Sequence, residues 1–161
     1  MAALRTARGT RSVRKSVCNV STRLSRLNGV HIDHANPGID NDFSDEHFVA
    51  FAGHKLAGSV QVSELTSEDA YVHTLFVCRE FRRRGIGRAL MLAVIDFAIA
   101  HGELYSLDIE HHPENAAARR LYKGLGFESV GESCGGERHR MSLTLRDDDG
   151  TLVYRPATEG D

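Results

Sequence analysis

The sequence predicts an α/β (α+β) fold in which helices flank one mixed central sheet, and two patterns together with a rule of strand pairing support this prediction. Alternating apolar residues on both sides of a Gly53-His54 turn predict an antiparallel hairpin over 47–63. An almost continuous apolar stretch over 85–101, followed by Gly102, predicts a nearly buried helix between two strands. Strands joined through a helix pair in parallel, whereas hairpin strands pair antiparallel, so the sheet is mixed.

The N-terminal half of the chain carries weaker signals. Residues 11–19 form a marginal strand candidate, and the apolar spacing over 20–27 fits a short helix. Turn signals dominate residues 28–45, where we expect a loop. A second turn over 64–69 precedes a strand over 71–77.

The C-terminal half continues the alternation of strands and helices. Polar and apolar residues alternate over 104–112, which predicts a strand. Asn115 is a good N-cap for a helix that Gly126 ends. Two final strands are expected over 127–133 and 138–145.

Length and composition are those of one soluble globular domain. The chain has 161 residues, of which 41% are hydrophobic and 26% are charged. We expect a basic, flexible tail over 1–17, a single domain over 18–146 and an acidic, frayed tail over 147–161. A mitochondrial-type transit peptide is the alternative interpretation of the basic tail.

The cysteines and the apolar runs indicate a cytoplasmic protein. The longest apolar run, 89–100, contains Asp96 and is too short to span a membrane. Three cysteines (Cys18, Cys78 and Cys134) lack C-x-x-C spacing, which suggests reduced thiols in a cytoplasm-like compartment.

Charge is unevenly distributed along the chain. Residues 1–32 contain seven of the 20 basic residues and no acidic one, which leaves 13 basic against 22 acidic residues. That remainder, near −9, argues against a general nucleic-acid-binding protein, which would carry positive charge across its docking face. Nucleic-acid binding through the basic tail is the weakest alternative, and a homodimer stays open.

The stretch Arg82-Arg83-Arg84-Gly85-Ile86-Gly87-Arg88 joins the strand over 71–77 to the long helix. The first amide N–H groups of a helix have no intrahelical partners, and they lie at the positive end of the helix dipole. The glycines let a bulky anion approach these amides, and the arginines add mobile positive charge. The turn is therefore interpreted as a cradle for a pyrophosphate group.

Two common phosphate-binding motifs do not fit this turn. The spacing G-x-x-x-x-G-K-[ST] is absent, and a G-x-G-x-x-G fingerprint that starts at Gly85 places Leu90 at its third glycine. The pattern [Q/R]-x-x-G-x-[G/A] fits instead, and the turn closely resembles the acyl-CoA-binding motif of the GNAT superfamily of N-acetyltransferases. For the turn alone, a solvated arginine-rich loop is the alternative.

A second stretch, Asn115-x-x-Ala118-x-x-Leu121-Tyr122-x-x-x-Gly126-Phe127, resembles the other GNAT signature and follows the first at the usual distance. The resemblance covers roughly residues 48–145 and implies acetyl-CoA as the acyl donor. It implies a sheet splayed between its fourth and fifth strands, where the pantetheine arm meets exposed main chain. The cofactor contacts implied in this way are Phe76, Val77, Arg82, Arg83, Arg84, Gly85, Ile86, Gly87, Arg88, Asn115 and Tyr122.

Acetyl transfer from a thioester to an amine needs a proton for the departing thiolate and a base for the amine. Tyr122 matches the family tyrosine commonly assigned as the general acid, and a core aromatic is the alternative. Asn115 matches the position that binds the cofactor, and it can act as an N-cap at the same time.

Two residues are candidates for the general base. Glu110 lies five residues before Asn115, where the chain resembles enzymes that acetylate protein N termini and carry a glutamate base. His73 lies nine residues before Arg82, where the chain is similar to arylalkylamine N-acetyltransferases with a catalytic histidine. Glu110 ranks slightly ahead, and either residue could be a polar group at a strand end.

The resemblance indicates an N-acetyltransferase that moves acetyl directly to a primary amine of a small molecule or a protein, without a covalent enzyme intermediate. The alternative is a non-catalytic acyl-CoA-binding or sensing module. In that family an apolar residue usually occupies the position of His111. The His111-His112 pair therefore either belongs to the acceptor site or lies at the edge of the sheet. No metal site is expected, because His111, His112, Cys134 and His139 lack recognisable ligand spacing.

Overall fold

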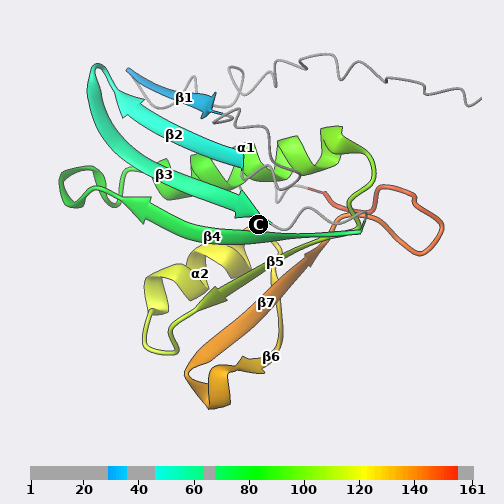
Figure 1. Ribbon diagram of the computed structural model, residues 1–161. Coiled ribbons are helices and arrows are strands. Elements are labelled where there is room, and N and C mark those ends of the chain that lie inside the picture. The colour runs from blue at the N-terminus through cyan, green and yellow to red at the C-terminus, as the bar shows by residue number, and fades with distance from the viewer. Residues whose placement is uncertain (1–28, 36–45, 64–67, 156–161) are drawn as a thin grey trace, which may run out of the picture.

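The computed structural model describes residues 29–35, 46–63 and 68–155, and this part of the chain forms a seven-stranded sheet with two α-helices (Figure 1). The strand order is β1-β2-β3-β4-β5-β7-β6, and every neighbouring pair is antiparallel except the parallel pair β4 and β5. The mixed α/β sheet predicted from the sequence is confirmed. The elements are β1 (Val30–Ala35), β2 (Glu46–Ala52), β3 (Lys55–Ser63), β4 (Asp69–Val77), α1 (Ile86–His101), β5 (Ser106–His111), α2 (Ala116–Gly124), β6 (Glu128–Ser133) and β7 (Arg138–Thr144).

The hairpin and both helices form where local patterns predict them. β2 and β3 pair antiparallel around the Gly53 turn. α1 ends at Gly102, whose left-handed backbone (φ 82°) is a common C-cap conformation for glycine. α2 begins after Asn115, whose Oδ1 accepts a hydrogen bond from the Ala118 amide at 3.1 Å. These predictions are confirmed because each depends on neighbours in sequence.

The loop predicted over 28–45 is wrong for residues 30–35, which form the edge strand β1. This strand pairs antiparallel with β2, from Val30 opposite Ala52 to Ala35 opposite His47. Turn-forming residues on both sides made the short alternation of apolar and polar residues in β1 hard to recognise. Pairing with β2 determines the extended conformation of this segment. The strand and helix candidates over 11–27 lie outside the described residues.

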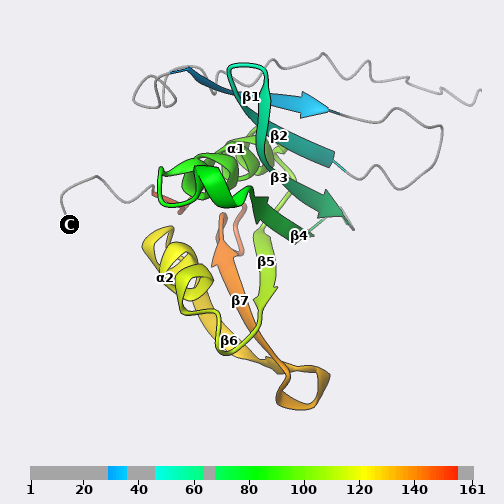
Figure 2. The ribbon, with the colours of Figure 1, turned by 90° about the vertical axis from the view of Figure 1, so that its left-hand side faces the viewer.

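Both helices lie on the same face of the sheet (Figure 2). α1 packs against β2, β3 and β4, and its buried residues form the core with the apolar face of those strands. Tyr122 of α2 contacts His111 of β5, and Leu121 of α2 approaches Gly87 of α1. Among the described residues, no helix covers the other face, and neither helix has the length and apolar composition that a membrane span requires.

The segment after β7 folds back on the domain up to residue 155, which corrects the expected fraying there. Asp147 Oδ1 accepts hydrogen bonds from the Asp149 and Thr151 amides at 3.1 and 2.8 Å. The Tyr154 amide donates to the Leu145 carbonyl at 3.2 Å, and the Tyr154 ring joins the buried core. Residues 156–161 lie outside the described part of the chain.

Candidate active site

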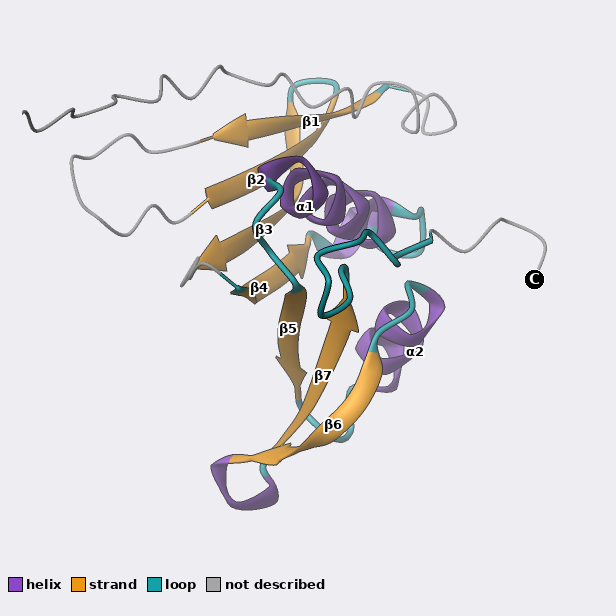
Figure 3. Ribbon diagram, turned by 90° about the vertical axis from the view of Figure 1, so that its right-hand side faces the viewer, coloured by secondary structure: helices purple, strands orange, loops and turns teal. Residues whose placement is uncertain are grey.

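The β4 and β5 strands are paired over only part of their length. Their parallel register runs from Asp69 opposite Ser106 to Val72 opposite Ile109. β4 continues for five residues and β5 for two beyond that point, and their outer sides still pair with β3 and β7. The strands therefore separate toward their C-terminal ends, as the resemblance implies (Figure 3).

A bulge in β4 accounts for the place where the strands separate. Gln61 of β3 stands opposite His73 and Ser59 opposite Phe76, so two steps along β3 match three along β4. Within the bulge, Thr74 has φ 41°, an uncommon conformation for a β-branched residue. Because a bulge bends its strand and increases the local twist, β4 turns away from β5 just beyond their last shared pair.

The turn between β4 and α1 presents a row of backbone amides. Its N-cap, Gly85, is left-handed at φ 80° and no side chain caps the helix, while Arg83 is also left-handed at φ 61°. Among the described residues, no backbone hydrogen bond uses an amide between 83 and 88, and the first into α1 is donated by Ala89 to Gly85. Successive amides in such a turn form a concave site for anions.

Two arginines of this turn are held by backbone carbonyls, which corrects the expectation that all four are mobile. Arg82 Nε donates to the Val77 carbonyl at 3.0 Å, so it fixes the turn to the end of β4. Arg88 Nη1 donates to the Gly124 carbonyl at 3.3 Å and joins α1 to the end of α2. A carbonyl carries no net charge, so the positive charge of both guanidinium groups still acts on the amide row.

On the helix-covered face, the buried side chain of Tyr122 lies beside His111 at the end of β5. Its side chain is only 5% exposed, and its ring centroid lies 6.0 Å from that of His111 and 5.9 Å from that of Phe127. Burial raises the pKa of Tyr122 to about 12, so the phenol is neutral and can donate a hydrogen bond. Asn115 uses its Oδ1 for the helix cap, and the cap leaves its amide donors unused.

On the opposite face, Tyr71 stands between the two candidate bases. The Tyr71 hydroxyl donates a hydrogen bond to Glu110, and the Tyr71 ring centroid lies 4.7 Å from that of His73. Burial, together with the hydrogen bond to Glu110 and its charge, raises the pKa of Tyr71 to about 12. Sequence reasoning missed Tyr71, although its position two residues before His73 on one strand face was the available signal.

A guanidinium group completes the polar cluster on this face. Arg140 of β7 stands opposite Glu110 in register and is hydrogen-bonded to Asp108, which raises the pKa of Arg140. The cluster of Asp108, Glu110 and Arg140 holds two carboxyl groups against one guanidinium group, a balance that favours a cationic amine. Within the described residues, no group of histidine, cysteine and carboxylate side chains is arranged to hold a metal ion.

The candidate site residues lie on both faces of the sheet where β4 and β5 separate. Glu110 and His111 are consecutive in β5, so their side chains point to opposite faces of the sheet. Glu110 lies with Tyr71 on the open face, and His111 lies with Tyr122 on the helix face. A ligand threaded between the strands would therefore meet a carboxylate on one side and a phenol on the other. Phe76 and Val77 belong to the part of β4 that pairs with β3 but not with β5.

Comparison with known sequences gives one family and several relatives. The model described as the acetyltransferase (GNAT) family matches residues 21–127. An N-alpha-acetyltransferase RimI of Mycobacterium tuberculosis is 37% identical over 89 residues, which cover 53% of this chain and 54% of that protein. A ribosomal protein bS18-alanine N-acetyltransferase of Salmonella typhimurium is 32% identical over 87 residues, covering 54% and 52%. The chain thus spans about half the length of the curated relatives it matches.

Solved structures share the fold. The ribosomal-protein-S18-alanine N-acetyltransferase from Escherichia coli superposes with a TM-score of 0.56 at 25% identity, over 68% of this chain and 75% of that one. A GNAT family acetyltransferase from Elizabethkingia anophelis with acetyl-CoA bound gives a TM-score of 0.62 at 17% identity, over 73% and 99%. At that lower identity, the likeness concerns the fold alone.

Proposed function

The chain belongs to the acetyltransferase (GNAT) family, and from this premise we propose that it transfers the acetyl group of acetyl-CoA to a primary amine. The observation that carries the proposal is the end of β4–β5 pairing after Val72 and Ile109. Beyond it, Glu110 and Tyr122 lie on opposite faces, where acid and base are needed. The first acceptor to test is a protein N-terminal amine, because two relatives are named as N-alpha- and alanine N-acetyltransferases.

The chain's own residues fit the acyl donor in two places. The amides between residues 83 and 88, which lack backbone acceptors among the described residues, are suited to the pyrophosphate. The unpaired edge of β4 at Phe76 and Val77 offers main-chain groups to the pantetheine arm. Asn115 adds amide donors from the start of α2.

Glu110 is the proposed general base. Its carboxylate takes a proton from the acceptor amine, directly or through a water molecule, while Tyr71 orients it by donating a hydrogen bond. The raised pKa keeps Tyr71 a neutral phenol, so Tyr71 is not itself a base near neutral pH. His73 is the second candidate, because its ring packs on the same tyrosine.

Tyr122 is the proposed acid on the other face. Its phenol donates a hydrogen bond to the sulfur as the thioester breaks, which stabilises the departing thiolate. The amine attacks the acetyl carbon directly, so neither Cys78 nor Cys134 forms an acyl intermediate. A Cys78→Ala, Cys134→Ala double variant is therefore expected to retain turnover, and a variant that binds acetyl-CoA without turnover would refute direct transfer.

The test measures release of the CoA thiol with matched acceptors. One peptide has a free N-terminal alanine and no lysine, and the second has a blocked N-terminus and one lysine. Turnover with the first peptide alone supports N-terminal acetylation, and turnover with the second alone reassigns the acceptor. Calorimetric binding of acetyl-CoA without thiol release from any peptide or small amine would instead favour a sensing module.

The two base candidates are separated by their substitutions. Glu110→Gln is expected to lower kcat at least about tenfold, because an amide accepts no proton. His73→Gln is expected to lower kcat less than about threefold if His73 only packs on Tyr71. The reverse ranking would transfer the role to His73.

A further inference from the structure

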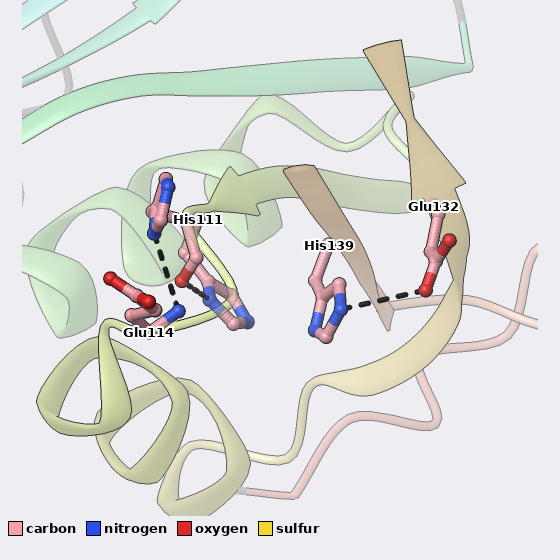
Figure 4. A network of polar contacts seen from close by, with 5 residues as sticks. His111, Glu114, Glu132 and His139 are labelled. Carbon is pink, nitrogen blue, oxygen red and sulfur yellow. Dashed lines mark hydrogen bonds and ion pairs between the residues drawn. The ribbon is translucent and has the colours of Figure 1, made fainter. Parts of the chain in front are cut away.

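His111 is a buried imidazole that the proposed reaction does not yet use. It ends β5 and is only 4% exposed. Its ring contacts Tyr122 of α2, with centroids 6.0 Å apart, and His139 of β7, with centroids 5.6 Å apart. Figure 4 shows His111 beside His139, with Glu132 and Glu114 on either side of the pair. A polar ring buried next to the proposed acid needs a reason, because burying it uncompensated is unfavourable.

The hydrogen bonds of His111 define which of its nitrogens can accept a proton. Its Nδ1 lies 2.9 Å from the His112 carbonyl oxygen, and a carbonyl can only accept, so Nδ1 carries a hydrogen. In the neutral ring, Nε2 is therefore the basic nitrogen, and protonation makes both nitrogens donors. His111 can thus take up and release a proton at Nε2 without losing its backbone hydrogen bond.

A second pair of side chains connects His111 to the surface. His139 Nε2 lies 3.6 Å from Glu132 Oε1, and the Glu132 side chain on the exposed strand β6 is 63% exposed. His112 faces the other way, since its Nδ1 accepts from the Glu114 amide at 3.3 Å. Among the described residues, the titratable side chains whose rings contact His111 are Tyr122 on one side and His139 on the other, and Glu132 beside His139 reaches solvent.

The high pKa of Tyr122 indicates that this phenol needs a more acidic neighbour to supply a proton to the thiolate. Burial raises the pKa of Tyr122 to about 12, whereas a free thiol titrates near 8.5. Complete transfer of the proton from this phenol to a thiolate is therefore unfavourable, because the thiol is the stronger acid. An imidazolium is a stronger acid than a thiol, so the transfer of a proton from imidazolium to the thiolate sulfur is favourable.

We propose that His111 supplies, through the Tyr122 hydroxyl, the proton that ends on the departing thiolate, and that His139 and Glu132 return a proton to His111 from solvent. The proposal rests on the proposed acetyl transfer. The Nε2–H bond of the imidazolium breaks as a new O–H bond forms at Tyr122, and the former Tyr122 proton bonds to sulfur. The amine proton leaves through the base on the opposite face, so protons balance over one turnover. His111 acts through Tyr122 and has no contact with substrate of its own.

The first experiment compares His111→Phe, which keeps an aromatic ring in the buried site, with the control His54→Gln in the exposed β2–β3 turn. Wild-type turnover tests the proposed function by itself. We expect His111→Phe to lower kcat about tenfold, to leave the KM for acetyl-CoA within about twofold, and to lose the alkaline limb of the kcat profile. Wild-type kcat and an unchanged profile in His111→Phe, with the wild type active, would overturn the relay.

The second experiment requires no turnover and decides the case of an inactive wild type. The imidazole of His111 is titrated by nuclear magnetic resonance in wild type, Tyr122→Phe and His139→Gln. A relay predicts that both substitutions shift the His111 midpoint by several tenths of a pH unit, because each removes a coupled group. Identical titration curves in all three proteins would reduce His111 to a packing residue. A matched shift caused by His54→Gln would show a global effect and would also contradict the proposal.

Discussion

At the N-terminus of α1 the cap is Gly85, which is left-handed and offers no side chain, whereas the cap of α2 is Asn115, whose Oδ1 accepts from the Ala118 amide at 3.1 Å. Both helices carry the same positive dipole end and the same surplus of amide donors. Only α2 satisfies part of that surplus with its own chain. An open end of this kind is stable in water and available to an anion, so we propose the start of α1, and not that of α2, as the phosphate-binding end.

The arginines near the two helix starts also differ in their position relative to the open amides. Arg83 and Arg84 directly precede Gly85, the cap of α1, and the Arg84 guanidinium lies 5.6 Å from the centre of the Phe81 ring. Arg119 and Arg120 lie within α2 and are exposed. We expect α1 to provide affinity for the acyl donor and α2 to provide chemistry through Tyr122.

The largest expected effect comes from reversing charge at the two starts. The Arg83→Glu, Arg84→Glu variant should weaken acetyl-CoA binding about a hundredfold. At about 6 Å in water, each reversal costs roughly 1.4 kcal/mol per phosphate charge, and two reversals combine. The matched Arg119→Glu, Arg120→Glu variant should weaken binding less than about fivefold. Calorimetry at two salt concentrations checks both variants, and equal losses would remove the distinction between the helices.

The next effect separates binding from chemistry on α2. Tyr122→Phe should lower kcat at least about tenfold, because the hydrogen bond to the departing thiolate is lost. The affinity for acetyl-CoA should stay within about twofold, since the ring still fills its buried site. Steady-state kinetics with calorimetry measures both quantities. Unchanged kcat would exclude Tyr122 from the mechanism and leave α2 a packing helix.

A smaller effect tests the open cap of α1 through Gly85. Gly85→Ala should weaken acetyl-CoA binding about fivefold, because a left-handed φ of 80° costs a side-chain-bearing residue about 1 kcal/mol and displaces the amide row. Gly102→Ala is the matched control, since Gly102 caps the other end of α1 with a φ of 82° and an added Cβ would meet nothing within 4 Å. The control should bind acetyl-CoA within about twofold of wild type. An equal loss in Gly102→Ala would mean that strain in α1, and not the geometry of its open cap, limits binding.

Local patterns predicted much of the fold because the interactions behind them are local. Gly102 ends α1 and Asn115 caps α2 through contacts within a few residues. The edge strand over 30–35 was missed because the sequence of β1 alone does not specify an extended conformation. Pairing with β2, which follows only after an intervening segment, determines it. The described part of the C-terminal segment was missed for the same reason, since Tyr154 is ordered by contacts with Leu145 and the core.

The candidate site was predicted residue by residue but not as a network. Motif spacing indicated Glu110 and Tyr122, whereas the hydrogen bond from Tyr71 to Glu110 joins neighbouring parallel strands and has no sequence signature. The bulge at Thr74, which separates the strands, also has no sequence signature, because a threonine does not require a φ of 41°.

The smallest expected effect distinguishes a cap from a ligand at the start of α2. Asn115→Ala should lower the free energy of unfolding by about 1 kcal/mol, because the Ala118 amide loses its acceptor. Asn115→Asp keeps an acceptor oxygen for the cap but replaces the amide donors with negative charge. Urea unfolding should therefore show Asn115→Asp close to wild type, while calorimetry should show weaker acetyl-CoA binding if those donors contact the ligand. Wild-type affinity in both variants would leave Asn115 a helix cap alone, and the closed start of α2 would then have no part in binding.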